Sequence, residues 1–362
     1  MKKLLIMAGG TGGHIMPGLA VAERLELEGW KIAWMGNPDG MEAKLTAGRG
    51  FEMAWIRFSA LRGKGLFRKL LLPVNLLRAF YQAYLHLGQI KPDLVLGFGG
   101  YISFPGGMMA VLKGIPLILH EQNSVAGLAN RVLARVADLV LTGFPNVLKG
   151  GEWVGNPVRP QIAGVSVGTN ALPTQRYAGR QGPLRILILG GSLGARALNE
   201  TVPRGLALIA PYDRPLVIHQ TGAHEVNAVK KLYTDLQVQA QCVPFITDMA
   251  RTYAEADLVI CRAGALTIAE LAAVGVASLL VPFPAAVDDH QTTNAQFLAH
   301  AGAAFLLPQS ELNPDRLKVI SSVSREQLAQ MAEKAHALAM PNASNAVARH
   351  CSELCKELTH ET

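Results

Sequence analysis

Two glycine-rich segments stand out among the residues that could bind or transform a ligand. They are Gly9-Gly10-Thr11-Gly12-Gly13-His14 and Gly190-Gly191-Ser192-Leu193-Gly194-Ala195. Each follows a short apolar run and precedes a helical pattern, so the sequence predicts a strand, a tight turn and a helix N-terminus. Backbone N–H groups and the helix dipole favour phosphate at such a turn. A turn that serves only strand–helix packing is the alternative for either segment alone.

Neither segment fits the usual nucleotide-binding fingerprints. The dinucleotide pattern would require glycine where the chain has Ile15, and a P-loop would require Gly-Lys followed by Ser or Thr. The chain also has no Asp-x-Asp pair to hold a divalent metal on a nucleotide sugar. Asp288 and Asp289 are adjacent at a predicted helix start, where their side chains should diverge. The sequence therefore predicts no metal site and no cofactor.

His14 falls on the first turn of the helix that the first segment predicts. A helix N-terminus disfavours the imidazolium cation, so a neutral His14 could act as a base or as a hydrogen-bond donor. A structural histidine bonded to the loop backbone is the alternative.

Polar residues also follow other apolar runs. His120-Glu121-Gln122-Asn123 and Tyr101 each come after a predicted strand, and Asn130 lies one helix beyond the first of these. Four polar residues at a strand end are costly to bury unless they serve a site, although ordinary loop packing is the alternative. Arg159, in Gly155-Asn156-Pro157-Val158-Arg159, could reach a diphosphate or could be an ordinary surface arginine.

The segment from Cys261 to Glu270 is the most informative of the later ones. An apolar run ends, small residues follow, and a helix begins near Ala265 to Thr267. The N–H groups of this helix start could hold a phosphate. Glu270 lies three residues after Thr267, which gives a capping-box pattern. Glu270 therefore either caps the helix or accepts both hydroxyls of a ribose.

A strand–turn–helix pattern begins at two points in the sequence, about one domain length apart, and it positions these segments. Continuous apolar runs favour parallel strands covered on both faces. We predict an α/β protein with two doubly wound, Rossmann-like parallel-sheet domains facing a cleft, and function in the loops after the strands. Strand-like runs lie at 4–8, 31–35, 94–97, 116–120, 139–141, 184–189, 216–220, 241–244, 258–261 and 278–281.

Composition agrees with a packed two-domain protein, because 50% of the 362 residues are apolar and 17% are charged. The formal net charge of +7 suits phosphate-bearing ligands, nucleic acid or an anionic membrane, or only a solvated surface. The basic residues are dispersed and form no nucleic-acid motif, so nucleic acid is not expected as a partner. The cysteines, Cys242, Cys261, Cys351 and Cys355, have no metal-type spacing, and packing as reduced thiols is expected. We expect neither a signal peptide nor a membrane span.

Residues 62–87 combine five basic residues with many leucines and aromatic residues. A basic amphipathic segment with aromatic residues suits the interface of an anionic membrane. An ordinary core helix with basic ends is the alternative.

Taken in order and at their spacing, these motifs closely resemble the MurG family of glycosyltransferases over essentially the whole chain. The resemblance rests on residues 9–14, Gly99-Gly100-Tyr101, His120–Asn123, Gly155–Arg159, 190–195 and Arg262–Thr267. The resemblance implies a GT-B fold and an inverting, metal-independent transfer of N-acetylglucosamine from UDP-N-acetylglucosamine to lipid I. The 4-hydroxyl of lipid I would attack, which forms the β-1,4 bond of lipid II in peptidoglycan synthesis. It also implies a peripheral protein on the cytoplasmic side of the bacterial inner membrane, with cell-wall synthesis and division proteins as further partners.

The resemblance also implies roles for individual residues and domains. His14 would be the first candidate for the general base and Glu121 the second, with Tyr101 and Asn130 on the acceptor side. The UDP-N-acetylglucosamine site would comprise Thr11, Gly12, Gly13, Asn123, Arg159, Ser192, Ile246, Ala265, Leu266, Thr267, Ile268, Ala269, Glu270 and Gln291. The domains would be 1–162 for acceptor and membrane, a linker at 163–183, 184–341 for the donor, and a helix at 342–362 that packs back on the first domain. The competing hypotheses are a GT-B-type UDP-N-acetylglucosamine 2-epimerase and a non-catalytic nucleotide-sugar-binding protein.

Overall fold

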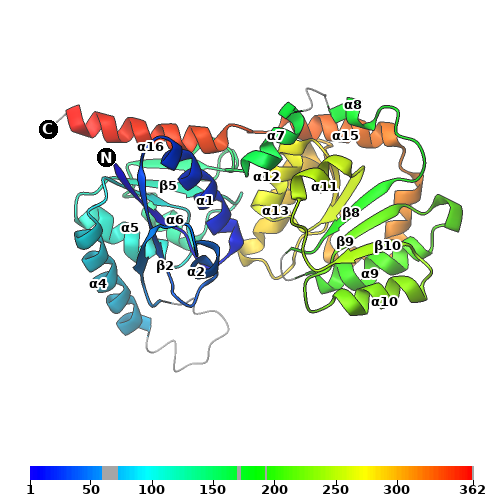
Figure 1. Ribbon diagram of the computed structural model, residues 1–362, viewed down its shortest axis with the longest axis horizontal. Helices are drawn as coiled ribbons and strands as arrows, with labels where there is room; N and C mark the ends of the chain where they lie inside the picture. Colours follow the sequence, from blue (N-terminus) through cyan, green and yellow to red (C-terminus); the bar gives the residue numbers. More distant parts are fainter. Residues whose placement is uncertain (59–71, 169–172, 192–193, 361–362) are drawn as a thin grey trace. The chain divides into compact units, whose positions relative to one another are not determined.

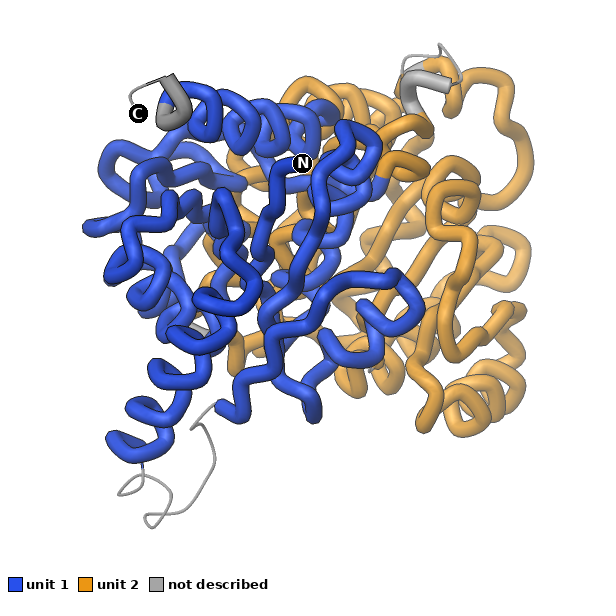
Figure 2. The backbone as a smooth tube through the Cα atoms, turned by 60° about the vertical axis from the view of Figure 1, so that its left-hand side comes forward, with its two compact units in different colours: residues 1–159, 341–362 blue, residues 160–340 orange. Residues whose placement is uncertain are grey.

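The structure is a computed structural model that describes residues 1–58, 72–168, 173–191 and 194–360 (Figure 1). The chain divides into two compact units, which are coloured separately in Figure 2. Unit 1 comprises Met1–Arg159 and Pro341–Thr362, and unit 2 comprises Pro160–Met340. Each unit is a parallel sheet with its own helices, so the predicted α/β class with two parallel-sheet domains is confirmed.

The sheet of unit 1 has the strand order β3-β2-β1-β4-β5-β6-β7, and every neighbouring pair is parallel. Its strands are β1 (Lys3–Met7), β2 (Lys31–Gly36), β3 (Glu52–Trp55), β4 (Leu94–Gly97), β5 (Leu117–Glu121), β6 (Leu139–Thr142) and β7 (Glu152–Trp153). Its helices are α1 (Gly12–Leu27), α2 (Met41–Leu45), α4 (Leu72–Ile90), α5 (Ser103–Leu112), α6 (Leu128–Leu133) and α16 (Ala343–His360).

Strand β1 shows why this sheet is covered on both faces. Leu4 and Ile6 belong to one buried cluster and Leu5 and Met7 to another, as expected when successive side chains point to opposite faces. The first cluster includes side chains from α1 and α16, and the second includes side chains from α4 and α5. A strand buried on both faces must be apolar throughout, which explains the continuous run in the sequence.

The sheet of unit 2 has the order β10-β9-β8-β11-β12-β13 and is also parallel throughout. Its strands are β8 (Arg185–Leu189), β9 (Leu216–Gln220), β10 (Ala240–Val243), β11 (Leu258–Cys261), β12 (Ala277–Leu280) and β13 (Ala304–Leu306). Its helices are α7 (Pro160–Gly168), α8 (Pro173–Tyr177), α9 (Arg196–Ala207), α10 (Val226–Asp235), α11 (Met249–Glu255), α12 (Ala265–Val274), α13 (His290–His300), α14 (Pro314–Leu317) and α15 (Arg325–Ala337). Short 3₁₀ turns, η1 (Pro211–Asp213), η2 (Val287–Asp289), η3 (Gln309–Glu311) and η4 (Lys318–Ser322), complete it.

The described parts of the stretch 163–183, for which the sequence indicates a linker, are more ordered than its glycine and proline content suggests. They hold the end of α7 and all of α8. Tyr177 is buried and donates its hydroxyl to the carbonyl of Asp257 at 2.9 Å, and Arg180 pairs with the Asp257 carboxylate at 2.5 Å. These contacts attach the stretch to unit 2.

Helix α16 brings the end of the chain back to unit 1, where it packs against α1. Cys351 and Cys355 are both buried there, in the same cluster as Val347 and Ala348. Burial raises the pKa of both thiols, so they remain protonated and pack as small apolar groups. The expectation that these cysteines serve packing is confirmed.

Helix α4 is the described part of the segment 62–87, since residues 59–71 lie outside the described residues. Its buried side carries Ala79, Ala83, Leu87 and Ile90. Its other side exposes Val74, Leu77, Tyr81, Tyr84 and Leu85. None of the helices in the described ranges is both long and apolar enough to cross a bilayer.

Candidate active site

In unit 1, the loops after β1, β2, β4 and β5 leave the same edge of the sheet, because these strands are parallel neighbours. The candidate residues His14, Tyr101, Glu121 and Asn123 all lie on or beside these loops. Unit 1 therefore places these four candidates at one edge of its sheet, and their roles toward the two substrates stay predictions.

The loop after β4 lies directly against the first glycine segment. A Cβ on Gly100 would come within 2.4 Å of the Gly9 carbonyl oxygen, and a Cβ on Gly10 within 3.1 Å of the Tyr101 ring. Gly100 also has a φ of +83°, which disfavours other residues. The two loops can approach this closely only because both positions are glycine.

His14 is half-buried on the first turn of α1. Its Nδ1 lies 3.2 Å from the Gly9 carbonyl oxygen and 3.3 Å from the Thr11 hydroxyl. A carbonyl oxygen only accepts, so the bond to Gly9 requires the proton on Nδ1. In a neutral ring the basic lone pair is then at Nε2. This tautomer is the one a general base at Nε2 needs.

Glu42, on the short helix α2, is fully buried beside the first glycine segment. Its Oε2 accepts the N–H of Gly10 at 3.1 Å, and its Oε1 accepts the N–H of Asn37 at 2.8 Å. Burial, and secondly the Glu42 charge, raise the pKa of Tyr101, while a hydrogen bond with Asn37 opposes this shift. A carboxylate that sequence reasoning did not single out therefore organises this edge.

The carboxylate of Glu121 holds the loop between β5 and α6. One oxygen accepts the N–H of Asn123 at 2.9 Å and its amide at 3.3 Å, and the other accepts the Gly127 N–H at 3.1 Å and the Asn130 amide at 2.9 Å. The side chain is only 2% exposed. These four donors occupy both carboxylate oxygens, so an organising role suits Glu121 better than proton transfer.

Beneath this loop, His120, Gln122 and Asn156 form a buried polar group. His120 bonds the Gly155 carbonyl at 2.9 Å, and Gln122 donates to the His120 carbonyl at 2.8 Å. Burial lowers the pKa of His120 to about 4, although the bond to Gly155 opposes the shift. The neutral His120 therefore fixes the backbone of the loops and is not poised for proton transfer.

Arg159, the last residue of the first segment of unit 1, is half-buried. Its role toward a diphosphate stays a prediction.

In unit 2, Ser192 lies outside the described residues, but the ends of its glycine segment are described. A Cβ on Gly190 would lie 2.4 Å from the Ala195 nitrogen, and one on Gly194 would lie 2.1 Å from the Thr221 carbonyl oxygen. Gln220, at the end of β9, donates to the Gly191 carbonyl at 3.0 Å and accepts the Ile246 N–H at 3.0 Å. Gln220 thus joins the glycine segment to the loop of Ile246, and a contact of Ile246 with uracil stays a prediction.

Helix α12 begins at Ala265, with Gly264 as its N-cap and no side-chain cap. Its first N–H groups, on Ala265, Leu266 and Thr267, have no carbonyl one turn earlier within the helix, which suits a phosphate. Ile268 is buried, and Leu266, Thr267 and Ala269 are half-buried. The predicted helix start is therefore present at Ala265, and its use as a phosphate site stays a prediction.

Gln291 and Asn294, on α13, hold the loop that precedes α12. The Gln291 Oε1 accepts the N–H groups of Ala263 at 3.2 Å and Phe283 at 2.9 Å, and Asn294 donates to the Ala263 carbonyl at 3.2 Å. Arg262 bonds the carbonyls of Val281 and Pro282, and burial lowers its pKa. With its oxygen engaged, Gln291 can offer only amide hydrogens to a sugar hydroxyl.

The interpretation of Glu270 as a helix cap is wrong. The helix begins at Ala265, so Glu270 lies in its second turn, and the N-cap is Gly264. The Glu270 carboxylate instead accepts the Tyr253 hydroxyl at 3.1 Å. The other reading, in which Glu270 accepts the hydroxyls of a ribose, remains.

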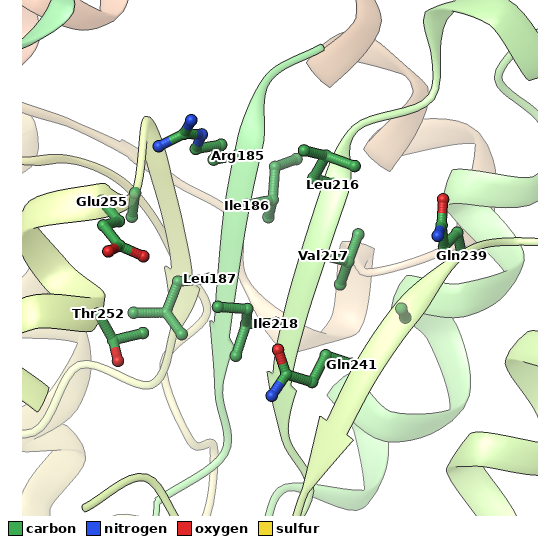
Figure 3. Close-up of a pocket in the computed structure, with 12 residues that line it drawn as sticks. Arg185, Ile186, Leu187, Leu216, Val217, Ile218, Gln239, Gln241, Thr252 and Glu255 are labelled. Carbon is green, nitrogen blue, oxygen red and sulfur yellow. The ribbon is translucent and has the colours of Figure 1, made fainter. Parts of the chain in front are cut away.

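A cavity of about 580 Å³ lies over the amino-terminal half of β8, β9 and β10, beside α11 (Figure 3). Its lining includes Arg185, Leu187, Ile218, Gln241 and Thr252. The loops named above follow the carboxyl ends of the strands, so this cavity is separate from them. Within the described ranges, no three His, Cys, Asp or Glu side chains gather as metal ligands would.

Comparisons with known proteins agree with this geometry. The model of the glycosyltransferase family 28 N-terminal domain matches residues 4–142, and that of the family 28 C-terminal domain matches residues 185–350. A protein of Dechloromonas aromatica named UDP-N-acetylglucosamine–N-acetylmuramyl-(pentapeptide) pyrophosphoryl-undecaprenol N-acetylglucosamine transferase is 63% identical, over 98% of this chain and 99% of its own. The Azoarcus protein of the same name is 64% identical, over 98% of this chain and 99% of its own. The crystal structure of Acinetobacter baumannii MurG aligns with a TM-score of 0.85 and 42% identity, covering 98% of this chain and 100% of that one.

Proposed function

This chain belongs to the MurG family of glycosyltransferases, and on that premise we propose that it makes lipid II. The reaction transfers N-acetylglucosamine from UDP-N-acetylglucosamine to the 4-hydroxyl of lipid I, an N-acetylmuramoyl-pentapeptide on undecaprenyl diphosphate. The observation that carries the proposal is the near full-length match to curated relatives named for this transfer.

The donor is assigned to unit 2. The first turn of α12 and the glycine segment 190–195, including Ser192, would take the diphosphate, because exposed N–H groups bind anions. Glu270 would accept the ribose hydroxyls, Ile246 would meet uracil through its backbone, and Gln291 would donate to the sugar. Support comes from the fixed loops, because Gln220 ties its loops to the end of β9 and Gln291 ties the Ala263 loop to α13.

The contributions of unit 1 to the donor site, from Thr11, Gly12, Gly13, Asn123 and Arg159, remain predictions. Of these, Gly12 and Gly13 begin α1, so their N–H groups could likewise receive a phosphate.

The general base is assigned to His14. The acceptor hydroxyl loses its proton to Nε2 as its oxygen bonds to the anomeric carbon, and the bond from that carbon to the diphosphate oxygen breaks. The electron pair leaves with UDP, and the configuration inverts. Support comes from the Nδ1 contact with Gly9, which leaves Nε2 as the basic atom.

Tyr101, Glu121 and Asn130 would shape the acceptor side of unit 1. Glu121 and Asn130 bond each other at 2.9 Å, and Tyr101 borders the first glycine segment.

Helix α4 is proposed to rest on the cytoplasmic face of the inner membrane. Val74, Leu77, Tyr81 and Tyr84 recur at helical spacing on its exposed side, and the Lys113 ammonium lies 3.6 Å from the Tyr84 ring centroid. Apolar and aromatic side chains beside cations suit an anionic lipid interface.

The test is incubation with radiolabelled UDP-N-acetylglucosamine and a lipid I analogue, with and without chelator. Label should enter the lipid at the same rate in both. Sugar-nucleotide turnover that does not require lipid would favour the epimerase hypothesis, and binding without turnover would favour a sensor. A rate abolished by chelator would contradict the metal-independent mechanism.

A further inference from the structure

Glu42 is connected to His14 through a single peptide group. The N–H of Gly10 donates to Glu42 Oε2 at 3.1 Å, and the carbonyl of Gly9 lies 3.2 Å from His14 Nδ1. The Gly9 carbonyl and the Gly10 N–H are the two ends of the same peptide bond. The order of groups is therefore carboxylate, peptide, imidazole.

The Glu42 side chain fits in its place because three neighbouring positions are glycine and carry no side chain. A Cβ would come within 2.6 Å of Glu42 side-chain atoms at Gly9 and Gly36, and within 2.5 Å at Gly40. Glu42 itself has no solvent-exposed surface. A buried carboxylate is costly unless it is bonded, and here both oxygens accept backbone N–H groups.

The peptide between Glu42 and His14 is also fixed in orientation. A Cβ on Gly100 would lie 2.4 Å from the Gly9 oxygen and 3.5 Å from His14 Nδ1. The absence of a side chain at Gly100 therefore leaves that carbonyl in reach of the imidazole. The peptide can present its N–H to Glu42 and its oxygen to His14 at once.

A carboxylate that accepts a peptide N–H polarises the whole peptide group. The carbonyl oxygen at the other end becomes more negative and a stronger acceptor, since hydrogen bonds in series strengthen each other by about 10–30% in low-dielectric surroundings. A stronger acceptor holds the Nδ1 proton of His14 more firmly. It also stabilises the imidazolium that forms when Nε2 takes a proton.

We propose that Glu42 is a positioning residue that orients His14 and supports its positive charge through the Gly9–Gly10 peptide. It fills the place that a carboxylate in direct contact holds in other histidine-dependent enzymes. In the reaction, the proton of the acceptor hydroxyl passes to Nε2, the Nδ1 proton stays bonded to the Gly9 carbonyl, and the Nε2 proton leaves to solvent afterwards. The inference rests on the proposed function, in which His14 is the base.

The competing explanation is a purely structural Glu42, which ties the Asn37 loop to the glycine segment. Such a role would lower the amount of folded protein or weaken substrate binding, without a specific effect on His14. The two explanations differ in turnover of the folded enzyme and in the state of the imidazole.

The experiment compares Glu42→Gln with Glu52→Gln, a matched control at an exposed position of the same unit. Glu42→Gln should lower kcat about ten- to hundredfold, with less than about a twofold change in the KM of either substrate. Glu52→Gln should keep wild-type constants. The double variant Glu42→Gln with His14→Ala should be no slower than His14→Ala alone, because Glu42 acts through the imidazole.

Nitrogen-15 NMR of the full-length protein with labelled histidine gives a readout that does not depend on turnover. At about pH 8, where histidine is ordinarily neutral, His14 should be protonated at Nδ1 in the wild type. In Glu42→Gln its nitrogen shifts should move toward a mixture of tautomers. Proton on Nε2 in the wild-type protein would overturn the proposal even if the variant failed to fold.

The remaining outcomes separate the two proposals. Wild-type kcat in Glu42→Gln, or a further loss in the double variant, would overturn the role of Glu42 while leaving lipid transfer intact. Absence of transfer by the wild type would overturn the proposed function, and the NMR tautomer would still test the link to Glu42.

Discussion

The hydroxyl of Tyr253 donates a hydrogen bond of 3.1 Å to the carboxylate of Glu270. Tyr253 is on α11 and is buried, whereas Glu270 is half-buried on the second turn of α12. This hydrogen bond, donated from the neighbouring helix, orients the carboxylate, so the orientation of Glu270 is set before any ligand binds.

If Glu270 accepts the ribose hydroxyls, Glu270→Gln should raise the KM for UDP-N-acetylglucosamine about ten- to hundredfold, since bonds to a charged acceptor contribute about 1.5–3 kcal/mol. Tyr253→Phe should raise it about three- to tenfold, because the carboxylate loses one orienting donor. Steady-state kinetics at saturating lipid would measure both. Tyr212→Phe, at an 84% exposed tyrosine of the same unit, is the control and should match the wild type. An unchanged KM in Glu270→Gln would remove the ribose assignment.

Replacing His14 by alanine should lower kcat about 10²- to 10⁴-fold, as expected when a general base is lost. The dissociation constant for UDP-N-acetylglucosamine, measured by calorimetry, should change little, because the proposed ribose and uracil contacts are all in unit 2. Turnover within about threefold of the wild type would mean that another group takes the proton.

Gly100→Ala and Gly114→Ala form a matched pair in unit 1. Both glycines have positive φ, +83° and +66°, but only at Gly100 would the Cβ meet the Gly9 carbonyl, whereas nothing lies within 4 Å at Gly114. Gly114→Ala should cost about 1–2 kcal/mol of stability from backbone strain alone and leave kcat unchanged. Gly100→Ala should lower kcat as well, by displacing the peptide that holds His14. Equal kinetics in the two variants would show that the loop contact does not matter for turnover.

The stability of unit 1 should fall in mild acid because of His120. Burial lowers its pKa from 6.5 to about 4, so between these values the unfolded chain binds the proton more readily than the folded unit. Stability is therefore lost as the pH falls from about 6.5 toward about 4, by about 2 kcal/mol at pH 5.

This prediction can be measured by urea unfolding followed by tryptophan fluorescence, because Trp30, Trp34, Trp55 and Trp153 all belong to unit 1. His120→Gln removes the titrating group, so its loss of stability between about pH 7 and pH 5 should be about 2 kcal/mol smaller than that of the wild type. The same slope in both proteins would contradict the assignment.

Leu77→Glu and Tyr81→Glu should weaken binding to vesicles of anionic phospholipid. Leu77 and Tyr81 are 68% and 64% exposed on α4, so the folded unit should tolerate either change. Sedimentation with vesicles should show at least about a tenfold loss for the pair, since each removes apolar burial and adds a repelled charge. Val319→Glu, at an exposed position of unit 2, is the control. Undiminished vesicle binding would place the membrane contact elsewhere.

The sequence predicted the sheets well because their strands are buried on both faces. Leu4, Leu5, Ile6 and Met7 must all be apolar for that reason, and such a run is legible without a structure. Loops that follow these parallel strands must lie at the carboxyl edge of the sheet, where ligands bind. For this reason the glycine segments and His14 could be selected from the sequence.

Other site residues carried no local signal. Glu42 lies in a five-residue helix too short to show a period, and its partners are backbone groups of two other loops. Gln220 and Tyr253 each reach across the sheet or to another helix, so only tertiary structure reveals them. Glu270 was ambiguous because Gly264, the true N-cap of α12, offers no side chain to mark the helix start.

Helix α16 has a consequence for how the protein is made. Val347, Ala348, Cys351 and Cys355 complete a hydrophobic cluster that Leu4 and Ile6 begin. During synthesis from the amino terminus, α16 is translated after all of unit 2, so unit 1 lacks its last helix until the end of the chain emerges. The half of the protein that is translated first is thus finished last, and a nascent chain arrested near residue 340 would expose apolar surface on unit 1 that chaperones can bind.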